Sequence, residues 1–539
     1  MTKNVLFIMC DQLRADYLGC GGHPTIRTPN IDALAARGVQ FSQSYVQSPI
    51  CGPSRMSTYT GRYVRSHGAT YNQVPLRVGE WTLGDHLNSL GARAVLCGKT
   101  HVRADIEGMK RLGIDPASTK GQHISEGGFE VWDRLDGLHP PGARMPSHYN
   151  DYLRKHGMGG KSPWQDWAAS VVDTDGTVKD GWLNENAHLP ARVPEVHSET
   201  AYSTNRAIEF MAQADDRPWC LHLSYIKPHW PIVAPAPYHN MYSPEDVVAP
   251  VLPTVGQPPL HPVYRHNQDL RYSTIYNKPG AREKVIATYM GLITQIDDHI
   301  GRLVGWLEQE DRLKDTMIIF TSDHGDYLGD HSMGEKLYFH DASVRVPLIV
   351  YDPDPKADAT RGMVDARLTE AIDLVPTIVD MMGGSVQSHI LEGRSLLPLT
   401  RAQDVTWRDC VFSEADYSQT PTRIALDQPV AGCGMVMAYD GRWKYVYCQG
   451  QRPMLFDLQT DPNEFNDLGA DPDLEAQRQR LGARVLEWAM AGRNRVTQSD
   501  ASVAQSEPEF IRGILIGFWD KAELQAAFDN LGTNPTKPL

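Results

Sequence analysis

Residues 5–12 read Val-Leu-Phe-Ile-Met-Cys-Asp-Gln, an apolar run that ends at once in a carboxylate and an amide. Three later apolar runs also end in polar clusters, at residues 98–101, 227–229 and 322–325. Such runs are typical of buried strands in a large, mostly parallel central sheet flanked by helices. In open α/β sheets, ligands bind beyond the carboxyl ends of the strands. The sequence therefore predicts an α/β fold whose functional site collects these Asp, His and Lys residues.

The helices between the predicted strands can also be located. Thr28-Pro29-Asn30 predicts the start of a helix, and Gly38 predicts its end. Between Arg282 and Glu310, apolar residues recur every three or four positions and form one stripe. Because this long helix leads directly into the apolar run at residues 317–320, we expect a helix–strand unit there.

The pattern changes after about residue 385. We expect a catalytic α/β domain over residues 1–385 and a smaller C-terminal α+β domain over residues 386–500. In the second part, residues 435–447 contain a central Asp-Gly pair typical of a β-hairpin, and a helix is predicted over residues 474–491. The tail, residues 501–539, carries large apolar residues between 510 and 519. They predict either an oligomerisation segment of a dimer or tetramer, or packing on the same chain.

The composition excludes several classes of partner. The 539 residues carry 66 Asp and Glu against 52 Lys and Arg, a formal net charge of −14. This acidic excess argues against nucleic acid and anionic membranes, which require clustered Lys and Arg. The eight cysteines form no C-x-x-C pair, and the N-terminal apolar run is too short for a signal peptide. We expect a cytoplasmic protein with reduced thiols, and if the substrate is an anion, its cationic site must be local.

Asp11, Gln12, Asp323 and His324 follow two of the predicted strands. If the strands are neighbours, these side chains form a set of oxygen donors with one imidazole, which is typical of a divalent-cation site. Oxygen ligands favour Ca, Mg or Mn, and the imidazole favours Mn more than an all-oxygen set would. The alternative is that Asp11 and Asp323 are helix N-caps, and spacing alone does not separate the two interpretations.

Residues 51–55, Cys-Gly-Pro-Ser-Arg, form the second reactive segment. Pro53 suits the first turn of a helix, which leaves Cys51 beside an N-terminus that attracts anions. A thiolate nucleophile would be stabilised there. Thiol phosphatases, however, need a longer loop between the cysteine and an arginine such as Arg55. From the residues alone, a buried structural cysteine is therefore the favoured interpretation.

Together with Thr60-Gly61-Arg62, this segment resembles the C-x-P-x-R signature of the sulfatases, members of the alkaline phosphatase superfamily. Other blocks resemble further motifs of that family, in the same order and over most of the chain. They are Asp11-Gln12 with residues 28–32, Gly98-Lys99-Thr100-His101, residues 227–231, residues 322–325 with 334–336 and 345–348, and residues 455–464. The resemblance implies an alkaline phosphatase-like fold.

The resemblance also implies a chemistry. In that family a formylglycine-generating enzyme converts the cysteine to formylglycine, whose hydrated aldehyde attacks sulfur or phosphorus in line. One divalent metal, Ca or Mn, lowers the pKa of the attacking hydroxyl. A histidine then deprotonates the second hydroxyl, which expels sulfate. The residues implied to bind the metal are Asp11, Gln12, Asp323, His324 and modified Cys51. Arg55 is implied to support formylglycine, and His101 is implied to take the proton of the second hydroxyl. Lys99, His229 and Lys336 are implied to bind substrate oxygens, and His229 or Lys336 to protonate the leaving group.

The sequence departs from many sulfatases, which carry two successive aspartates after the first strand and Asp-Asn in the later block. Asp11-Gln12 and Asp323-His324 instead resemble the phosphonate monoester hydrolases, relatives that often also cleave sulfate monoesters and phosphodiesters. Lys99 and His101, however, resemble the sulfatase choice and favour departure of a sulfate dianion. We therefore expect an arylsulfatase-type sulfate-ester hydrolase, with phosphonate monoester and phosphodiester hydrolysis as the alternative or side activity.

Two further points concern the ligand, a small sulfate or phosphonate ester. Asn72 is an additional candidate for contact with a substrate oxygen. Residues 135–196 and 228–262 show little periodicity, and we expect them to form walls over the strand ends that contact the leaving group. A protein that binds such anions without catalysis is the interpretation from a different class.

Overall fold

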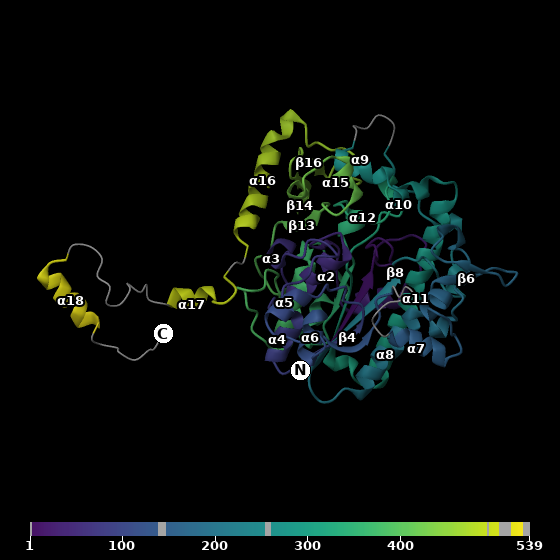
Figure 1. Ribbon diagram of the computed structural model, residues 1–539, viewed down its shortest axis with the longest axis horizontal. Helices are drawn as coiled ribbons and strands as arrows, with labels where there is room; N and C mark the ends of the chain where they lie inside the picture. The colour runs from purple at the N-terminus through teal and green to yellow at the C-terminus, as the bar shows by residue number, and fades with distance from the viewer. Residues whose placement is uncertain (1–2, 138–146, 254–259, 493–494, 506–518, 532–539) are drawn as a thin grey trace.

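The computed structural model describes residues 3–137, 147–253, 260–492, 495–505 and 519–531 (Figure 1). An eight-stranded sheet forms its centre, in the order β11-β2-β10-β9-β1-β8-β4-β5. In that order the strands are Met363–Asp365, Val39–Phe41, Leu348–Tyr351, Thr316–Ser322, Asn4–Asp11, Trp219–Pro228, Arg93–Gly98 and Glu130–Arg134. Only β10 runs antiparallel to its neighbours among these strands. The predicted mostly parallel α/β fold is confirmed.

Strand β1 lies in the middle of the sheet and is buried on both faces. Leu6 and Ile8 pack into one hydrophobic core, and Val5 and Phe7 pack into another, because successive side chains of a strand point to opposite faces. The helices α1 (Pro29–Arg37), α8 (Glu199–Gln213) and α11 (Ala281–Gln309) cover the first face. The other face is covered by α2 (Cys51–Thr60), α4 (Leu83–Ser89) and α13 (Leu374–Met381). A continuous apolar strand therefore suits this position.

Helix α1 begins and ends where the sequence predicts, but its N-terminus is capped from another helix. The side chain of Thr28 accepts no hydrogen bond from the first turn. Instead, the carboxylate of Asp297 in α11 accepts the backbone N–H groups of Asn30 at 3.1 Å and Ile31 at 2.7 Å. The capping contact thus ties α1 to α11 on one face of the sheet.

The smaller C-terminal domain contains an antiparallel sheet in the order β13-β14-β15-β16, at the top of Figure 1. Its strands are Val411–Asp416, Gly434–Tyr439, Trp443–Cys448 and Met454–Asp457. The predicted hairpin is confirmed as β14 and β15. Helix α16 (Glu475–Met490) contributes Leu481 to a core with Trp443, Tyr445 and Leu455. The α+β character is confirmed, whereas the boundaries after residues 385 and 500 stay predictions.

The first segment of low periodicity contains more structure than the sequence predicts. Residues 135–196 include α7 (His148–Lys155), a π-helical turn at Trp164–Ala168 and a small hairpin of β6 (Ser170–Val172) and β7 (Val178–Asp180). Buried residues such as Tyr149 and Trp164 give this segment its own core. Large apolar side chains spaced without helical or strand periodicity explain why the pattern was not visible.

Most of the predicted oligomerisation segment, residues 510–518, lies outside the described residues. On either side of it the structure has α17 (Asp500–Gln505) and α18 (Lys521–Leu531), which Figure 1 draws apart from the rest of the chain. The predicted oligomer stays a prediction. Within the described ranges, no helix combines the length and the apolar character needed to cross a lipid bilayer.

The cap on α1 can be tested with Asp297→Ala. Loss of the carboxylate leaves two amides of the first turn without their acceptor, and we expect a local destabilisation of about 1–2 kcal/mol. Amide hydrogen exchange, read by mass spectrometry on a peptide covering residues 28–38, should accelerate by about tenfold. Asp297→Asn keeps one acceptor oxygen and should have the smaller effect. Unchanged exchange in the Ala variant would contradict the capping role.

Candidate active site

The parallel strands bring their polar ends to one edge of the sheet. Asp11 is the last residue of β1, and Asp323 directly follows the neighbouring strand β9. Lys99 follows β4, and His229 follows β8. Cys51 begins α2, so that its side chain lies at the N-terminus of that helix. Chain segments separated by up to three hundred residues therefore meet at one place.

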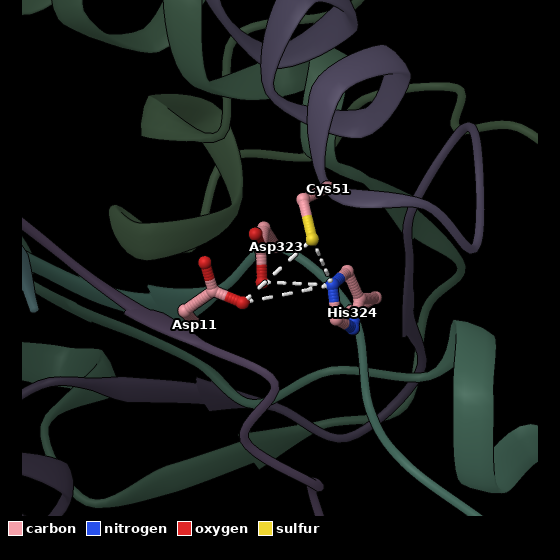
Figure 2. A group of neighbouring side chains, drawn as sticks. All are labelled: Asp11, Cys51, Asp323 and His324. Atoms are coloured by element: carbon pink, nitrogen blue, oxygen red, sulfur yellow. Dashed lines mark hydrogen bonds and ion pairs between the residues drawn. The ribbon is translucent and has the colours of Figure 1, made fainter. Parts of the chain in front are cut away.

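Four side chains form a compact, buried cluster at this edge (Figure 2). One ligand atom each from Asp11, Cys51, Asp323 and His324 lies within 4.8 Å of the others. Cys51 Sγ is 3.0 Å from His324 Nε2 and 3.8 Å from Asp11 Oδ1. His324 Nδ1 is 2.8 Å from the carbonyl oxygen of Gly325, which can only accept, so Nδ1 carries a proton and Nε2 is the ring nitrogen that faces the cluster.

The donor types and their spacing fit a divalent cation. Carboxylate oxygens bind Ca at about 2.3–2.6 Å, so ligand atoms around one ion lie at most about 5 Å apart. The cluster meets this limit with two carboxylates and one imidazole nitrogen. The cluster is therefore compatible with a metal site, whichever ion is bound.

Arg55, in the first turns of α2, joins the two carboxylates. Its side chain is completely buried, with Nε 2.7 Å from Asp323 Oδ2 and Nη2 3.3 Å from Asp11 Oδ2. Nη1 donates to the carbonyl oxygen of Lys99 at 2.9 Å and to Ser224 Oγ at 2.8 Å. Burial alone would lower the pKa of Arg55, but Asp323 and Asp11 are among the neighbours that raise it well above its ordinary value. Arg55 thus fixes α2 against β1, β4, β8 and β9.

Asp11 also interacts with two of the predicted oxygen-binding residues. Lys99 Nζ lies 2.5 Å from Asp11 Oδ2, and His229 Nε2 lies 3.9 Å from Oδ1. Burial and Cys51 raise the pKa of Asp11, but Lys99, His229 and Arg55 hold it below its ordinary value. The carboxylate therefore stays ionised, as a cation ligand must.

Lys336 reaches the cluster through Gln12. Lys336 Nζ donates to Gln12 Oε1 at 2.8 Å, and the backbone N–H of Gln12 donates to Asp323 Oδ1 at 3.0 Å. The Gln12 side-chain amide donates to Asp326, which leaves its carbonyl oxygen as the acceptor. Burial would lower the pKa of Lys336, whereas Cys51, Glu335 and Asp11 raise it, so Lys336 is charged at neutral pH. The structure brings Gln12 to the cluster, while its binding to a metal stays a prediction.

The environment of Cys51 favours an anion. Burial would raise the pKa of its thiol, but Lys336, His324, Lys99 and a hydrogen bond with His101 hold that pKa well below its ordinary value. His101 has a left-handed backbone, with φ of 55°. Its Nδ1 is buried without a hydrogen-bond partner within the described part of the chain. His101 therefore lies beside Cys51, as the predicted proton acceptor must.

Asn72 is held against the start of α2. Its Oδ1 accepts the backbone N–H of Gly52 at 2.9 Å, and a Cβ atom at Gly52 would lie 2.7 Å from that oxygen. Glycine at position 52 therefore permits the close approach of Asn72. Asn72 therefore lies against Gly52, the residue that follows Cys51 in the chain. The contact of Asn72 with a substrate stays a prediction.

Several neighbours of the site were not singled out by the sequence patterns. Ser224 and Asp326 orient Arg55 and Gln12. Lys227, buried in β8, donates to the carbonyl oxygen of Pro231 at 2.8 Å and so supports the turn that carries His229. Ser224, Lys227 and Asp326 stand close in the sequence to predicted site residues. The residues that Ser224 and Asp326 bind lie far away in the chain, so sequence spacing does not predict those contacts.

An aromatic pair adjoins the cationic residues. The Trp230 ring lies 4.1 Å from the His229 ring and 6.0 Å from Lys336 Nζ. The Trp182 ring, from the segment over residues 135–196, lies 5.4 Å from Trp230 and is about one-third exposed. Both long segments thus contribute an aromatic side chain near the site.

Comparisons with known proteins agree with this geometry. Residues 3–385 match a family model described as Sulfatase, and residues 329–490 match one described as N-sulphoglucosamine sulphohydrolase, C-terminal. The multifunctional alkaline phosphatase superfamily protein PehA of Trinickia caryophylli is 33% identical over 92% of this chain and 96% of its own length. The arylsulfatase of Clostridium perfringens is 28% identical, over 87% and 90%.

A solved structure is similar over nearly the whole chain. The phosphonate monoester hydrolase SpPMH from Silicibacter pomeroyi superposes with a TM-score of 0.79 and 28% identity, covering 92% of this chain and 96% of that one. The match covers nearly all of both chains, so the two chains share one fold.

The role of Arg55 can be tested with Arg55→Met in the presence of a chelator. Removal of the guanidinium leaves two buried carboxylates without their shared partner, which should cost about 3–5 kcal/mol of stability. The midpoint of thermal unfolding should fall and should recover in part when Ca or Mn is added. Arg37→Met is the matched control, because the Arg37–Glu308 pair is half-exposed and contributes less than about 1 kcal/mol. Equal unfolding midpoints for both variants would contradict this role of Arg55.

Proposed function

The chain belongs to the sulfatase family of the alkaline phosphatase superfamily, and we propose that it is an arylsulfatase-type hydrolase of sulfate monoesters. Phosphonate monoesters and phosphodiesters are the alternative substrates of the same site. One observation carries the proposal. Cys51 lies at the N-terminus of a helix inside a cluster of two carboxylates and an imidazole, with Lys99 and Lys336 beside it.

The proposed nucleophile is a formylglycine made from Cys51 by a formylglycine-generating enzyme. One oxygen of the hydrated aldehyde would then lie at the position that Sγ has in the structure. The hydrated aldehyde would supply a hydroxyl that, once deprotonated at the metal, attacks sulfur or phosphorus. The bond to the leaving oxygen would break, and that oxygen would take a proton from Lys336. His101, which is among the neighbours that hold the pKa of Cys51 below its ordinary value, would then take the proton of the second hydroxyl. The C–O bond to the bound sulfate breaks, and the aldehyde is restored.

The proposed metal site consists of Asp11, Asp323 and His324, completed by Gln12 and residue 51. A bound Ca or Mn ion supplies a positive charge that lowers the pKa of the attacking hydroxyl. The chain's own cations supply the remaining stabilisation. Lys99 and His229 lie at Asp11, where they can bind the nonbridging oxygens of the substrate.

Lys336 is the favoured proton donor to the leaving group. It is buried, charged and held at Gln12 Oε1, so it can donate to an oxygen that develops negative charge. His229 is the alternative donor. Burial lowers its pKa below the ordinary value, so it is the weaker source of a proton at neutral pH.

The neighbouring indoles support an aromatic leaving group. Trp230 lies beside both candidate donors, and Trp182, tilted by 52° to Trp230, extends the aromatic surface toward solvent. Aromatic rings pack well against such a surface. The names of two similar proteins, an arylsulfatase and a phosphonate monoester hydrolase, agree with ester substrates of this kind.

Two further parts of the proposal concern the state of the protein. We propose that it acts in the cytoplasm, in line with the reduced-thiol character of the sequence, and as a homo-oligomer formed through its C-terminal tail. All eight cysteines are free in the structure, which agrees with a reducing compartment.

A non-catalytic protein that binds anionic ligands remains the second candidate, supported by the same cationic residues.

The modification at position 51 separates these candidates. Protein made in a host that has the converting enzyme should yield a tryptic peptide ending at Arg55 with formylglycine in place of Cys51. Cys51→Ala should abolish ester hydrolysis and leave thermal unfolding close to that of the unmodified protein, because alanine keeps the Cβ atom and removes only Sγ from the buried site. A peptide found only with unmodified cysteine, in protein without turnover, would support the binding candidate.

The preferred ester can be tested on one preparation. We expect kcat/KM for an aryl sulfate to exceed that for an aryl phenylphosphonate. Lys99→Ala should lower kcat/KM for the aryl sulfate more than kcat/KM for the aryl phenylphosphonate, by about tenfold or above. The reason is that it removes a charge that stabilises the departing sulfate dianion. A strong preference of the wild type for the phosphonate would contradict the sulfatase assignment and favour the alternative substrates.

A further inference from the structure

The backbone around Lys336 is irregular and strained. Glu335 and Leu337, which flank it, have φ of 61° and 109°, in the left-handed region that non-glycine residues seldom adopt. Each such residue costs about 1–3 kcal/mol and persists only when the surrounding structure holds it. The position of Lys336 must therefore be fixed by contacts outside its own segment.

One such contact comes from the smaller domain. Lys444 in β15 is completely buried, and its Nζ lies 2.7 Å from Asp341 Oδ1 and 2.6 Å from Glu464 Oε1. It also donates to the carbonyl oxygen of Phe339 at 3.0 Å. Phe339 and Asp341 are three and five residues beyond Lys336. A lysine of the second sheet thus binds the segment that carries the proposed proton donor.

The arrangement forms a closed group of charges. Glu464 Oε2 accepts the backbone N–H of Asp341 at 2.9 Å, and Arg345 Nε lies 2.9 Å from Asp341 Oδ2. The backbone N–H of Phe339 donates to the hydroxyl of Tyr264 at 3.2 Å. Removing one member would leave buried charges without a partner, which is costly. The segment after Lys336 is therefore held from several directions.

We propose that Lys444 is a positioning residue for the hydrolysis, which acts by holding Phe339 and Asp341 so that Lys336 faces the leaving group. The inference rests on the proposed role of Lys336. It makes the smaller domain part of the catalytic apparatus, although that domain contributes no side chain to the cluster at the sheet edge. Lys444 itself does not touch the substrate.

The test compares Lys444→Met, Lys336→Ala and the double variant on aryl sulfates whose leaving groups span a range of pKa. Lys444→Met should lower kcat/KM for the poorest leaving groups by about tenfold to a hundredfold more than for activated esters. A weakly basic leaving oxygen needs little protonation, so the activated esters should change least. In the Lys336→Ala background, Lys444→Met should add almost nothing to this selectivity, because both act through one group.

Arg442→Met is the matched control. Arg442 is on the same hairpin, half-exposed, with Nη2 2.8 Å from Asp457 Oδ2, and it does not contact the segment after Lys336. This variant should leave the dependence on the leaving group unchanged. Glu464→Gln, which keeps Lys444 and Asp341 paired, is the milder second variant if Lys444→Met does not fold. It should change the selectivity in the same direction by a smaller factor.

Four results would overturn the inference. Equal losses for all leaving groups in Lys444→Met, or independent losses in the double variant, would show a purely structural role. If Lys336→Ala itself leaves the dependence on the leaving group unchanged, the proposed role of Lys336 also fails. If Lys336→Ala changes the dependence on the leaving group and Lys444→Met does not, only the positioning role of Lys444 fails.

Discussion

The buried guanidinium of Arg55 is the contact on which the rest of the site depends. Two carboxylates, Asp11 and Asp323, lie at adjacent strand ends with no exposure to solvent, and in a low dielectric their repulsion would separate the strands. The planar fork of an arginine can bind both at once and still donate to a backbone carbonyl. Because Arg55 lies on α2, the same contact brings the helix N-terminus and Cys51 to the carboxylates.

The local charge explains how an acidic protein can hold an anionic ester. Arg55, Lys99 and Lys336 gather around the cluster, whereas the whole chain has a net charge of −14. At physiological ionic strength, charges more than about 8 Å from the substrate are largely screened when they are exposed to solvent. Buried cations at contact distance are screened far less. The sign of the electrostatic potential at the site is therefore set by the nearest buried residues and not by the exposed charges of the protein surface.

Much of the fold could be predicted because burial leaves a direct mark on the sequence. The run at residues 5–10 is apolar at every position, which indicates a strand covered on both faces, and Asp11 marks its end. What the pattern cannot give is the partner of a side chain. Asp297 capping α1, Asp326 binding Gln12 and Lys444 binding Asp341 each join segments distant in the chain. Residues 135–196 show little periodicity because their core is built from isolated large side chains.

Cys51 is only 2% exposed once α2 has packed on the sheet. A separate enzyme cannot reach a side chain in that position, so the proposed conversion to formylglycine would require a chain that is still open. The contacts that complete the site extend to Glu464, near the end of the smaller domain. During synthesis, some four hundred residues are therefore added after Cys51 before the last of these contacts can form. For the proposed maturation, translation itself would provide the time window, and slower elongation would lengthen it.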